Sequence, residues 1–173
     1  PRHFDTAEVK LLIDAVQSSR FITPQKSKAL IRKLGVFIEP QQKQLLKRQL
    51  YIDHRSKATN ESVILIVDHL YTAIIERKKV TFQYFDYTPE KKKVHRHGGQ
   101  LYTVSPYAML WNNDQYYMVG YSEERKLVAT YRVDRISQLT VTEEPARKRP
   151  ADFTISDYFG QTFSMYLGEE AKV

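Results

Sequence analysis

The stretch that most constrains the fold is residues 105–136, SPYAMLWNNDQYYMVGYSEERKLVATYRVDRI. An apolar segment leads into the polar turn 112–114, an aromatic segment follows at 115–121, and the charged turn 122–126 precedes a second β-rich segment that closes on 132–136. Short apolar segments joined by tight polar turns are typical of antiparallel strands connected as hairpins. The pattern therefore predicts an antiparallel meander around which the rest of the chain is arranged.

Further strands are predicted on both sides of this meander. Residues 80–85 alternate and are rich in β-formers, and residues 100–104 form the returning strand after a charged hairpin loop at 88–99. The pair Ser105-Pro106 is expected to break the chain before the meander, and residues 136–142 are predicted as the last strand. About five strands with short turns indicate a small, strongly bent sheet or barrel.

Helices are predicted before the strands. The first spans residues 5–19, the second begins at Thr23 and ends at Gly35, and a third, shorter helix begins at Pro40. Residues 61–77 form the strongest helix, and its apolar face is unusually wide. We expect this face to pack on the sheet on one side and on the amino-terminal helices or a partner chain on the other.

The predicted fold class is therefore α+β, with amino-terminal helices followed by a small antiparallel sheet. Three regions are expected: a helical linker or dimerisation region at 1–58, a helix with the sheet at 59–144, and a basic linker with the start of a truncated extension at 145–173. Because the sequence begins at Pro1 rather than at a methionine, we expect a fragment of a longer protein.

Composition limits the classes of function. A net charge of +7 and a pI near 9.5 favour contact with polyanions through phosphate neutralisation, although a basic domain without a nucleic-acid partner stays open. Cysteine is absent, which excludes disulfides, thiolate nucleophiles and cysteine-based zinc sites and favours a reducing, cytoplasmic setting. No apolar run is long enough to cross a bilayer, so no membrane partner is expected.

Several motifs resemble those of the WYL domain, a family found in bacterial transcriptional regulators. Tyr116-Tyr117-Met118 holds the position of the name-giving Trp-Tyr-Leu, Pro106-Tyr107 opens the central strand, and Arg132-Val133-Asp134-Arg135-Ile136 matches the closing motif. The tripeptide departs from the family, since Tyr116 and Met118 replace Trp and Leu. The resemblance implies an Sm-like five-stranded antiparallel β-barrel, a winged helix-turn-helix upstream and a carboxyl-terminal extension.

Arg132 and Arg135 are the leading candidates for ligand binding. A planar guanidinium presents a fork of donors that matches phosphate, so two of them near one strand end would form an anion clamp. Side chains three apart on a regular strand face opposite sides, so the pair converges only if the strand ends or bends near Asp134. An alternative stays open, in which Arg135 pairs with Asp134 or Asp86 and only braces the barrel.

Ser105, Tyr107 and Tyr117 are predicted to supply hydroxyls and a stacking face beside these arginines. Bases of single-stranded nucleic acid stack on aromatic rings, whereas tyrosines in alternating strands are also ordinary packing residues. The basic runs 91–93 and 147–149 are further hypothetical phosphate contacts. Their alternative is a solvated surface.

Catalysis finds no support in the sequence, and no cofactor is expected. The chain has no Gly-rich phosphate loop, no paired-carboxylate motif, and no Ser or His in a recognisable nucleophile setting. His95 and His97 flank Arg96, but no third ligand lies within reach in the sequence, so no metal site is predicted.

The leading functional hypothesis is a regulatory, ligand-sensing module of a transcription factor. A single-stranded oligonucleotide, a nucleotide or another phosphate-bearing ligand would bind the barrel, and the helices would relay the bound state to a missing upstream DNA-binding domain and to a partner in a homodimer. The alternative is a structural dimerisation module whose basic surface adds only non-specific nucleic-acid affinity.

Overall fold

The computed structural model describes residues 4–38, 57, 59–90, 92–156 and 158. By its internal contacts the chain divides into two compact units, Pro1–Glu61 and Ser62–Val173. Within the described residues, no helix is long and apolar enough to cross a membrane. Each unit is described separately below.

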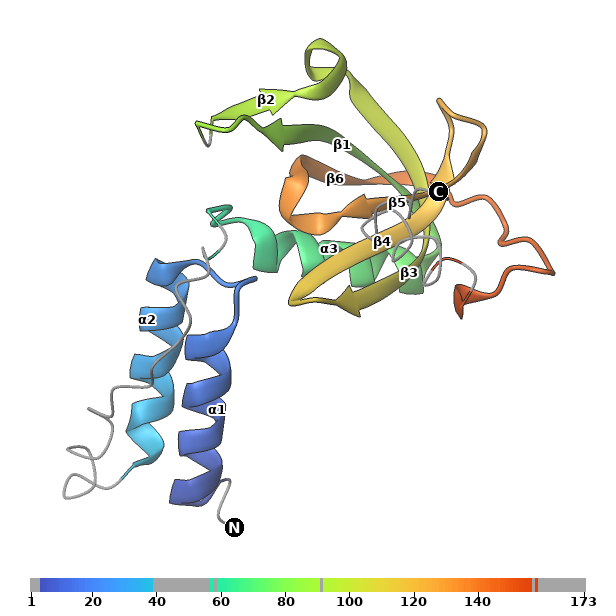
Figure 1. Cartoon of the computed structure of the whole chain (residues 1–173). Helices are drawn as coiled ribbons and strands as arrows, with labels where there is room; N and C mark the ends of the chain where they lie inside the picture. The colour runs from blue at the N-terminus through green and yellow to red at the C-terminus, as the bar shows by residue number, and fades with distance from the viewer. Residues whose placement is uncertain (1–3, 39–56, 58, 91, 157, 159–173) are drawn as a thin grey trace, which may run out of the picture. The chain divides into compact units, whose positions relative to one another are not determined.

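The first unit contains two helices that lie side by side, α1 (Thr6–Ser18) and α2 (Pro24–Leu34), followed by the short 3-10 helix η1 (Gly35–Phe37) (Figure 1). A capping box begins α1, because Asp5 Oδ1 accepts from the Glu8 amide at 2.9 Å and Glu8 Oε2 accepts from the Asp5 amide at 2.7 Å. The Thr23 hydroxyl accepts from the Lys26 amide at 3.1 Å and caps α2. Both predicted helices are confirmed.

The core of this unit is small. Val9 and Ile13 of α1 pack with Ile38, and α2 adds the partly buried Ile31 and Leu34. The Lys57 ammonium donates to the carbonyls of Val16 and Ser19, at 3.3 and 2.8 Å, and so neutralises the carboxyl end of α1. The helix predicted from Pro40 lies outside the described residues.

The second unit consists of one helix followed by strands. The helix is α3 (Val63–Glu76), close to the predicted range 61–77. The strands and intervening 3-10 turns are β1 (Lys78–Tyr87), β2 (Lys93–His95), η3 (Arg96–Gly99), β3 (Leu101–Asn112), β4 (Gln115–Ser122), β5 (Leu127–Arg132), η4 (Val133–Arg135) and β6 (Ile136–Pro145). The aromatic strand and both turns of the predicted meander are confirmed.

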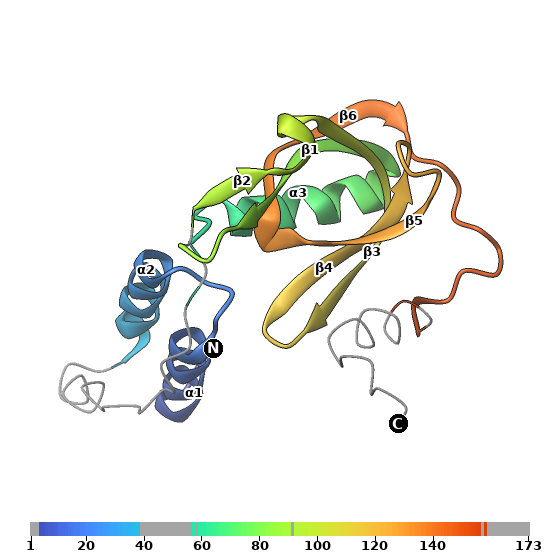
Figure 2. The same ribbon diagram turned by 45° about the horizontal axis from the view of Figure 1, so that its top comes forward.

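All strand pairs are antiparallel, and β1 is the central strand. The order is β2-β1-β3-β4-β5, with β6 also paired to β1, which gives a six-stranded sheet. The sheet curves strongly and α3 lies along it (Figure 2). The α+β class is confirmed. A closed five-stranded Sm-like barrel is not, because no pairing joins β5 to β6 in the described part of the chain.

The predicted break at Ser105-Pro106 is wrong, since β3 runs through it without interruption. Pro106 pairs with Gly120 and Ala108 with Val119, so a bulge sits between them, and a bulge tolerates a residue that has no amide donor. The two strands approach closely here. A Cβ on Gly120 would lie 2.5 Å from the Ser105 carbonyl oxygen. The loop predicted at 88–99 is also partly wrong, because it contains β2, which pairs with the end of β1.

The core of the second unit contains four aromatic rings, called the aromatic cluster below. Phe82 lies 5.7 Å from Tyr102, nearly parallel, and 5.3 Å from Tyr131, edge to face. Tyr84 completes the cluster, 5.5 Å from Tyr131 and 6.1 Å from Tyr102. Rings from β1, β3 and β5 thus meet inside the curve of the sheet. The helix α3 packs its buried face on β1, β3, β6 and η4.

The outer side of α3 keeps apolar residues exposed. Leu65 is 61% exposed and Ile75 is 78% exposed, and Tyr71 lies between them in sequence with 45% exposure. The expectation that this helix also meets the amino-terminal helices or a partner chain stays a prediction, and so do the homodimer and the predicted domain boundaries.

Gly120→Ala is expected to destabilise the second unit by about 3 kcal/mol, because the added methyl meets backbone that cannot yield. Gly98→Ala is the control. Its position has a φ of +65° but nothing within 4 Å, so strain alone should cost about 1 kcal/mol. Trp111 is the only tryptophan and lies on β3, so urea unfolding followed by its fluorescence reports on this unit. Equal losses in the two variants would contradict the close approach.

Candidate ligand-binding site

The chain bends after Arg132, which meets the condition under which Arg132 and Arg135 can converge. Strand β5 ends at Arg132, and η4 turns the chain so that β6 can pair with β1 instead of β5. The Tyr84 hydroxyl accepts a hydrogen bond from the Arg132 amide at 3.0 Å, which ties β5 to β1 at the bend. Arg132 and Arg135 therefore lie on either side of a sharp turn.

Both arginines are held by carboxylates. Arg132 donates from Nε and Nη2 to the two oxygens of the buried Asp134, at 3.1 and 2.8 Å. Arg135 Nη1 donates to Asp86 Oδ1 at 2.6 Å, and Arg96 Nε donates to the other Asp86 oxygen. The pairing of Arg135 with Asp86, one of the open alternatives, is thus observed. We call Arg96, Arg132, Arg135, Asp86 and Asp134 the arginine cluster.

The arginine cluster holds three guanidinium groups against two carboxylates, so it retains positive charge. The hydrogen bond from Arg96 lowers the pKa of Asp86 and raises the pKa of Arg96, which keeps this pair ionised. Burial raises the pKa of Tyr84 to about 12, so its phenol stays neutral. Arg135 Nε is buried with no hydrogen-bond partner in the described part of the chain.

The other three predicted residues have different surroundings. Ser105 is fully buried and its hydroxyl accepts from the Arg147 amide at 2.9 Å. The Tyr107 hydroxyl donates to the Lys148 carbonyl at 3.2 Å, and its ring meets Phe153 edge to face at 5.6 Å. Tyr117 is 6% exposed and packs with Leu110, Val119, Val128, Phe153 and Tyr158. Residues 146–153 and Tyr158 therefore cover these three side chains.

The predicted site is accordingly divided. Arg132 and Arg135 belong to the arginine cluster, while Ser105 and Tyr107 belong to the covered face of the sheet. Tyr117 lies between the two groups, because it is covered by Phe153 and Tyr158 and also pairs with Arg132 in the β4–β5 ladder.

A basic pocket of about 430 Å³ opens beside Tyr107. Its charged lining residues are Arg77, Arg147, Lys148 and Arg149, and no carboxylate lines it. Arg77 ends α3 in a left-handed conformation with a φ of 54°, and its carbonyl accepts from the Ala146 amide at 2.7 Å. This bond holds the Arg147–Arg149 run against the end of the helix.

The cations of the basic pocket carry no ion pair in the described part of the chain. Carboxylates close to them in sequence are committed elsewhere. Glu76 and Glu143 pair with Lys78, and Glu144 pairs with Lys79. Two of the arginines instead lie over rings, Arg147 over Tyr121 at 4.2 Å and Arg149 over Phe153 at 5.4 Å. Their positive charge is therefore available to an anion.

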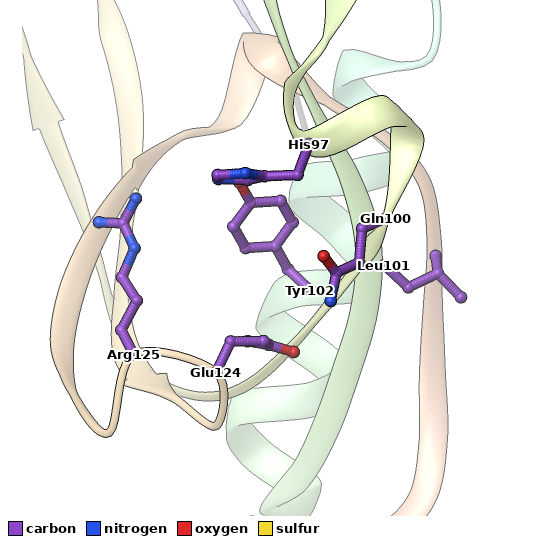
Figure 3. A pocket seen from close by; sticks show the side chains of 6 residues that line it. All are labelled: His97, Gln100, Leu101, Tyr102, Glu124 and Arg125. Carbon is purple, nitrogen blue, oxygen red and sulfur yellow. The ribbon is translucent and has the colours of Figure 1, made fainter.

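A second pocket, of about 170 Å³, lies beside the aromatic cluster and is lined by His97, Gln100, Leu101, Tyr102, Glu124 and Arg125. Figure 3 shows the Tyr102 ring in the middle of this aromatic pocket, with its hydroxyl behind the His97 ring. Glu124 and Arg125 come from the β4–β5 turn and face Tyr102.

Sequence reasoning missed Arg77, Arg96 and the whole aromatic pocket. Arg77 is followed by Lys78 and Lys79, which marks a basic stretch in the sequence. An arginine at the end of a helix is also ordinary, so the sequence alone does not identify Arg77 as a site residue. His95 and His97 have separate partners, because His95 Nε2 lies 3.3 Å from the Ser137 hydroxyl and the His97 ring lies 6.1 Å from that of Tyr102. Among the described residues, no three His, Asp or Glu side chains are grouped to hold a metal ion.

No curated protein matches the sequence. Among solved structures, the chain is similar to proteasome accessory factor B/C (PafBC) of Arthrobacter aurescens, at 15% sequence identity and a TM-score of 0.43. That match covers 87% of this chain and 22% of the other, so this chain spans about a fifth of the length of that protein. Residues 65–141, from α3 into β6, match the family model of the WYL domain.

Proposed function

We propose that the second unit is the ligand-sensing, regulatory domain of a transcriptional regulator and has a binding rather than a catalytic role. Its ligand is a single-stranded oligonucleotide, a nucleotide or another phosphate-bearing molecule. The observation that carries the proposal is the basic pocket, where Arg77, Arg147, Lys148 and Arg149 meet without a carboxylate. The WYL domain match supports the regulatory class.

The chemistry of the basic pocket suits phosphate. Guanidinium groups donate two parallel hydrogen bonds to phosphate oxygens, and a lysine adds a mobile point charge. A volume of about 430 Å³ lies within the usual range for small-ligand sites, roughly 300–1,000 Å³. The half-buried Tyr107 adds a ring beside the cations, which suits a nucleotide better than a bare phosphate.

The arginine cluster is the proposed second contact. A phosphate that replaces Asp134 on Arg132 would meet the same donor fork that the carboxylate now occupies. Tyr117 pairs with Arg132 across β4 and β5, so displacement of Phe153 and Tyr158 would bring that ring beside the bound phosphate. In this proposal, Tyr107 already lines the basic pocket, and the buried Ser105 is reached by movement of the Arg147 backbone that covers its hydroxyl.

The proposed relay runs through α3. Arg77 at its carboxyl end lines the basic pocket, and Ile74 from the preceding turn lines it too. The buried face of α3 packs on the sheet, so a ligand that draws Arg77 toward it favours one position of the helix over another. Such differential affinity is what a switch toward an upstream DNA-binding domain requires.

The competing proposal is a structural dimerisation module with only non-specific nucleic-acid affinity. The exposed Leu65, Tyr71 and Ile75 of α3 are the observation that favours it. The two proposals differ in binding behaviour. A specific site saturates and keeps part of its affinity as salt rises, whereas a diffuse basic surface loses affinity steeply with salt.

Charge reversal tests the basic pocket. Lys148→Glu/Arg149→Glu is expected to weaken binding of a fluorescent, 5′-phosphorylated single-stranded oligonucleotide by at least about tenfold, because two cations lining one phosphate site are lost. Lys92→Glu/Lys93→Glu is the matched control. This control variant makes the same change in net charge. It also removes a cation that lies over an aromatic ring, since Lys93 lies 4.7 Å from the centre of the Phe85 ring, as Arg149 lies over Phe153. Fluorescence anisotropy measures both Kd values. Equal weakening by the two variants would favour the non-specific module.

Asp134→Asn tests the second contact. Removing the carboxylate releases the Arg132 guanidinium from its ion pair, so the oligonucleotide should bind about fivefold more tightly. Arg132→Gln/Asp134→Asn removes the cation as well and should bind more weakly than the unmodified chain. Asp68→Asn, which changes an exposed carboxylate on α3, controls for net charge. If Asp134→Asn and Asp68→Asn have the same affinity, Arg132 does not contact the ligand.

A further inference from the structure

The aromatic pocket has features that neither the basic pocket nor the arginine cluster uses. Its lining combines a flat aromatic wall, hydrogen-bonding side chains and one cation within about 170 Å³. That volume is below the roughly 300–1,000 Å³ of sites for drug-sized ligands, so it admits one planar ring system. The lining comes from η3, from the start of β3 and from the β4–β5 turn (Figure 3).

A buried hydroxyl at this pocket lacks a partner. Tyr102 is 5% exposed, and its hydroxyl makes no hydrogen bond within the described part of the chain. An unsatisfied buried hydroxyl costs free energy, and such groups in native proteins call for an explanation such as a ligand. The Tyr102 ring lies in the pocket and its hydroxyl lies behind the His97 ring (Figure 3).

His97 is positioned to uncover this hydroxyl. Its side chain is exposed, and its backbone has a φ of 49°, a left-handed conformation that is costly for a residue with a Cβ. Gly98 and Gly99 follow with φ values of 65° and 85°. Because glycine has no Cβ, Gly98 and Gly99 can adopt other backbone conformations with little steric resistance, which allows the neighbouring His97 to shift. A ligand that shifts the imidazole gains access to the Tyr102 ring and hydroxyl together.

Glu124 supplies a fixed acceptor at the edge of the pocket. Its Oε1 accepts from the Thr103 amide at 2.6 Å and its Oε2 accepts from the Ser122 hydroxyl at 3.1 Å. These bonds hold the carboxylate in place, while the second lone pair of each oxygen remains to accept from a ligand. Among the nucleobases, guanine presents two adjacent donors, N1–H and N2–H, to such a carboxylate. The Gln100 amide provides both a donor and an acceptor nearby.

Arg125 supplies the charge. It is exposed on the β4–β5 turn, and its guanidinium makes no hydrogen bond or ion pair among the described residues. Figure 3 shows it across the pocket from Tyr102 and Gln100. A phosphate attached to a base in the pocket would meet this donor fork.

We propose that the aromatic pocket binds one guanine nucleotide, with the base against Tyr102, its donor edge on Glu124 and its phosphate on Arg125. The nucleotide is either a free 5′-monophosphate or the 5′-terminal unit of an oligonucleotide, since both present the same base and phosphate. This site is separate from the basic pocket, and the proposal does not depend on ligand binding there.

Calorimetric titration of the intact chain tests the proposal with 5′-GMP, 5′-AMP and the 5′-phosphorylated dinucleotide pGpT. GMP is expected to bind at least about tenfold more tightly than AMP, and Glu124→Gln is expected to remove this preference. A pGpT affinity far above that of GMP identifies the oligonucleotide end as the source, and equal affinities identify the free nucleotide. Equal Kd values for GMP and AMP, or no binding of GMP and pGpT, would overturn the proposal.

Tyr102→Phe provides a second variant that keeps the ring and its packing. Because the hydroxyl has no partner, the melting temperature is expected to stay unchanged or to rise, while GMP affinity falls about fivefold. Lys92→Glu, an exposed change outside the pocket, is the control and should retain GMP binding. Unaltered GMP affinity in Tyr102→Phe, or a large drop in its melting temperature, would contradict the assigned role of this hydroxyl.

Discussion

The second unit depends on the contact of four aromatic rings from three strands. Within the described residues β5 and β6 do not pair with each other, so no strand ladder closes the sheet between β5 and β1. The aromatic cluster does so, with Tyr131 against Phe82 and Tyr84. Aromatic pairs of this geometry contribute about 0.5–1.5 kcal/mol each beyond their burial. The Tyr84–Arg132 hydrogen bond then fixes where β5 ends.

The positions of the arginine cluster and of the aromatic pocket both follow from the packing of these four rings. Because β5 stops at Arg132, the chain turns through η4 and brings Arg135 to Asp86 on β1. Arg96 pairs with the same carboxylate and lies 5.3 Å from the centre of the Tyr84 ring. Tyr102, another member of the cluster, forms the wall of the aromatic pocket. The aromatic cluster therefore positions both the arginine cluster and the aromatic pocket.

Charge distribution separates the two cationic regions. In the arginine cluster, two carboxylates neutralise most of the positive charge of the three arginines. The side chains of Arg132 and Arg135 are also partly buried. In the basic pocket, the neighbouring Glu76, Glu143 and Glu144 bind Lys78 and Lys79 instead, which leaves Arg77 and the 147–149 run without a counter-charge. The cations of the basic pocket thus form a local concentration of positive charge, and this pocket is a stronger attractor for phosphate than the arginine cluster.

The parts of the fold that depend on residues close together in the sequence were predictable from the sequence alone. The helix starts at Asp5 and Thr23 follow from capping residues, and the aromatic strand follows from its β-forming residues between two polar turns. The bend after Arg132 is the condition that the spacing of the two arginines set for them to converge. The continuity of β3 through Pro106 could not be predicted, because it requires Gly120 of another strand opposite the bulge. The pairing of Arg135 with Asp86, 49 residues away, is likewise set by the tertiary fold.

The covering of Ser105, Tyr107 and Tyr117 was equally beyond local reasoning, since it depends on a later segment that folds back over the sheet. Strand β2 was not predicted because it is short and all three of its residues are exposed, so it lacks the alternation that marks a strand.

The most direct test of the central claim is an NMR titration that follows the arginine Nε–Hε resonances as a 5′-phosphorylated single-stranded oligonucleotide is added. The account predicts that the resonances of Arg77, Arg147 and Arg149 shift together and saturate at one equivalent. Shifts confined to Arg20 and Arg32 of the first unit, or shifts that spread over all arginines without saturation, would contradict it.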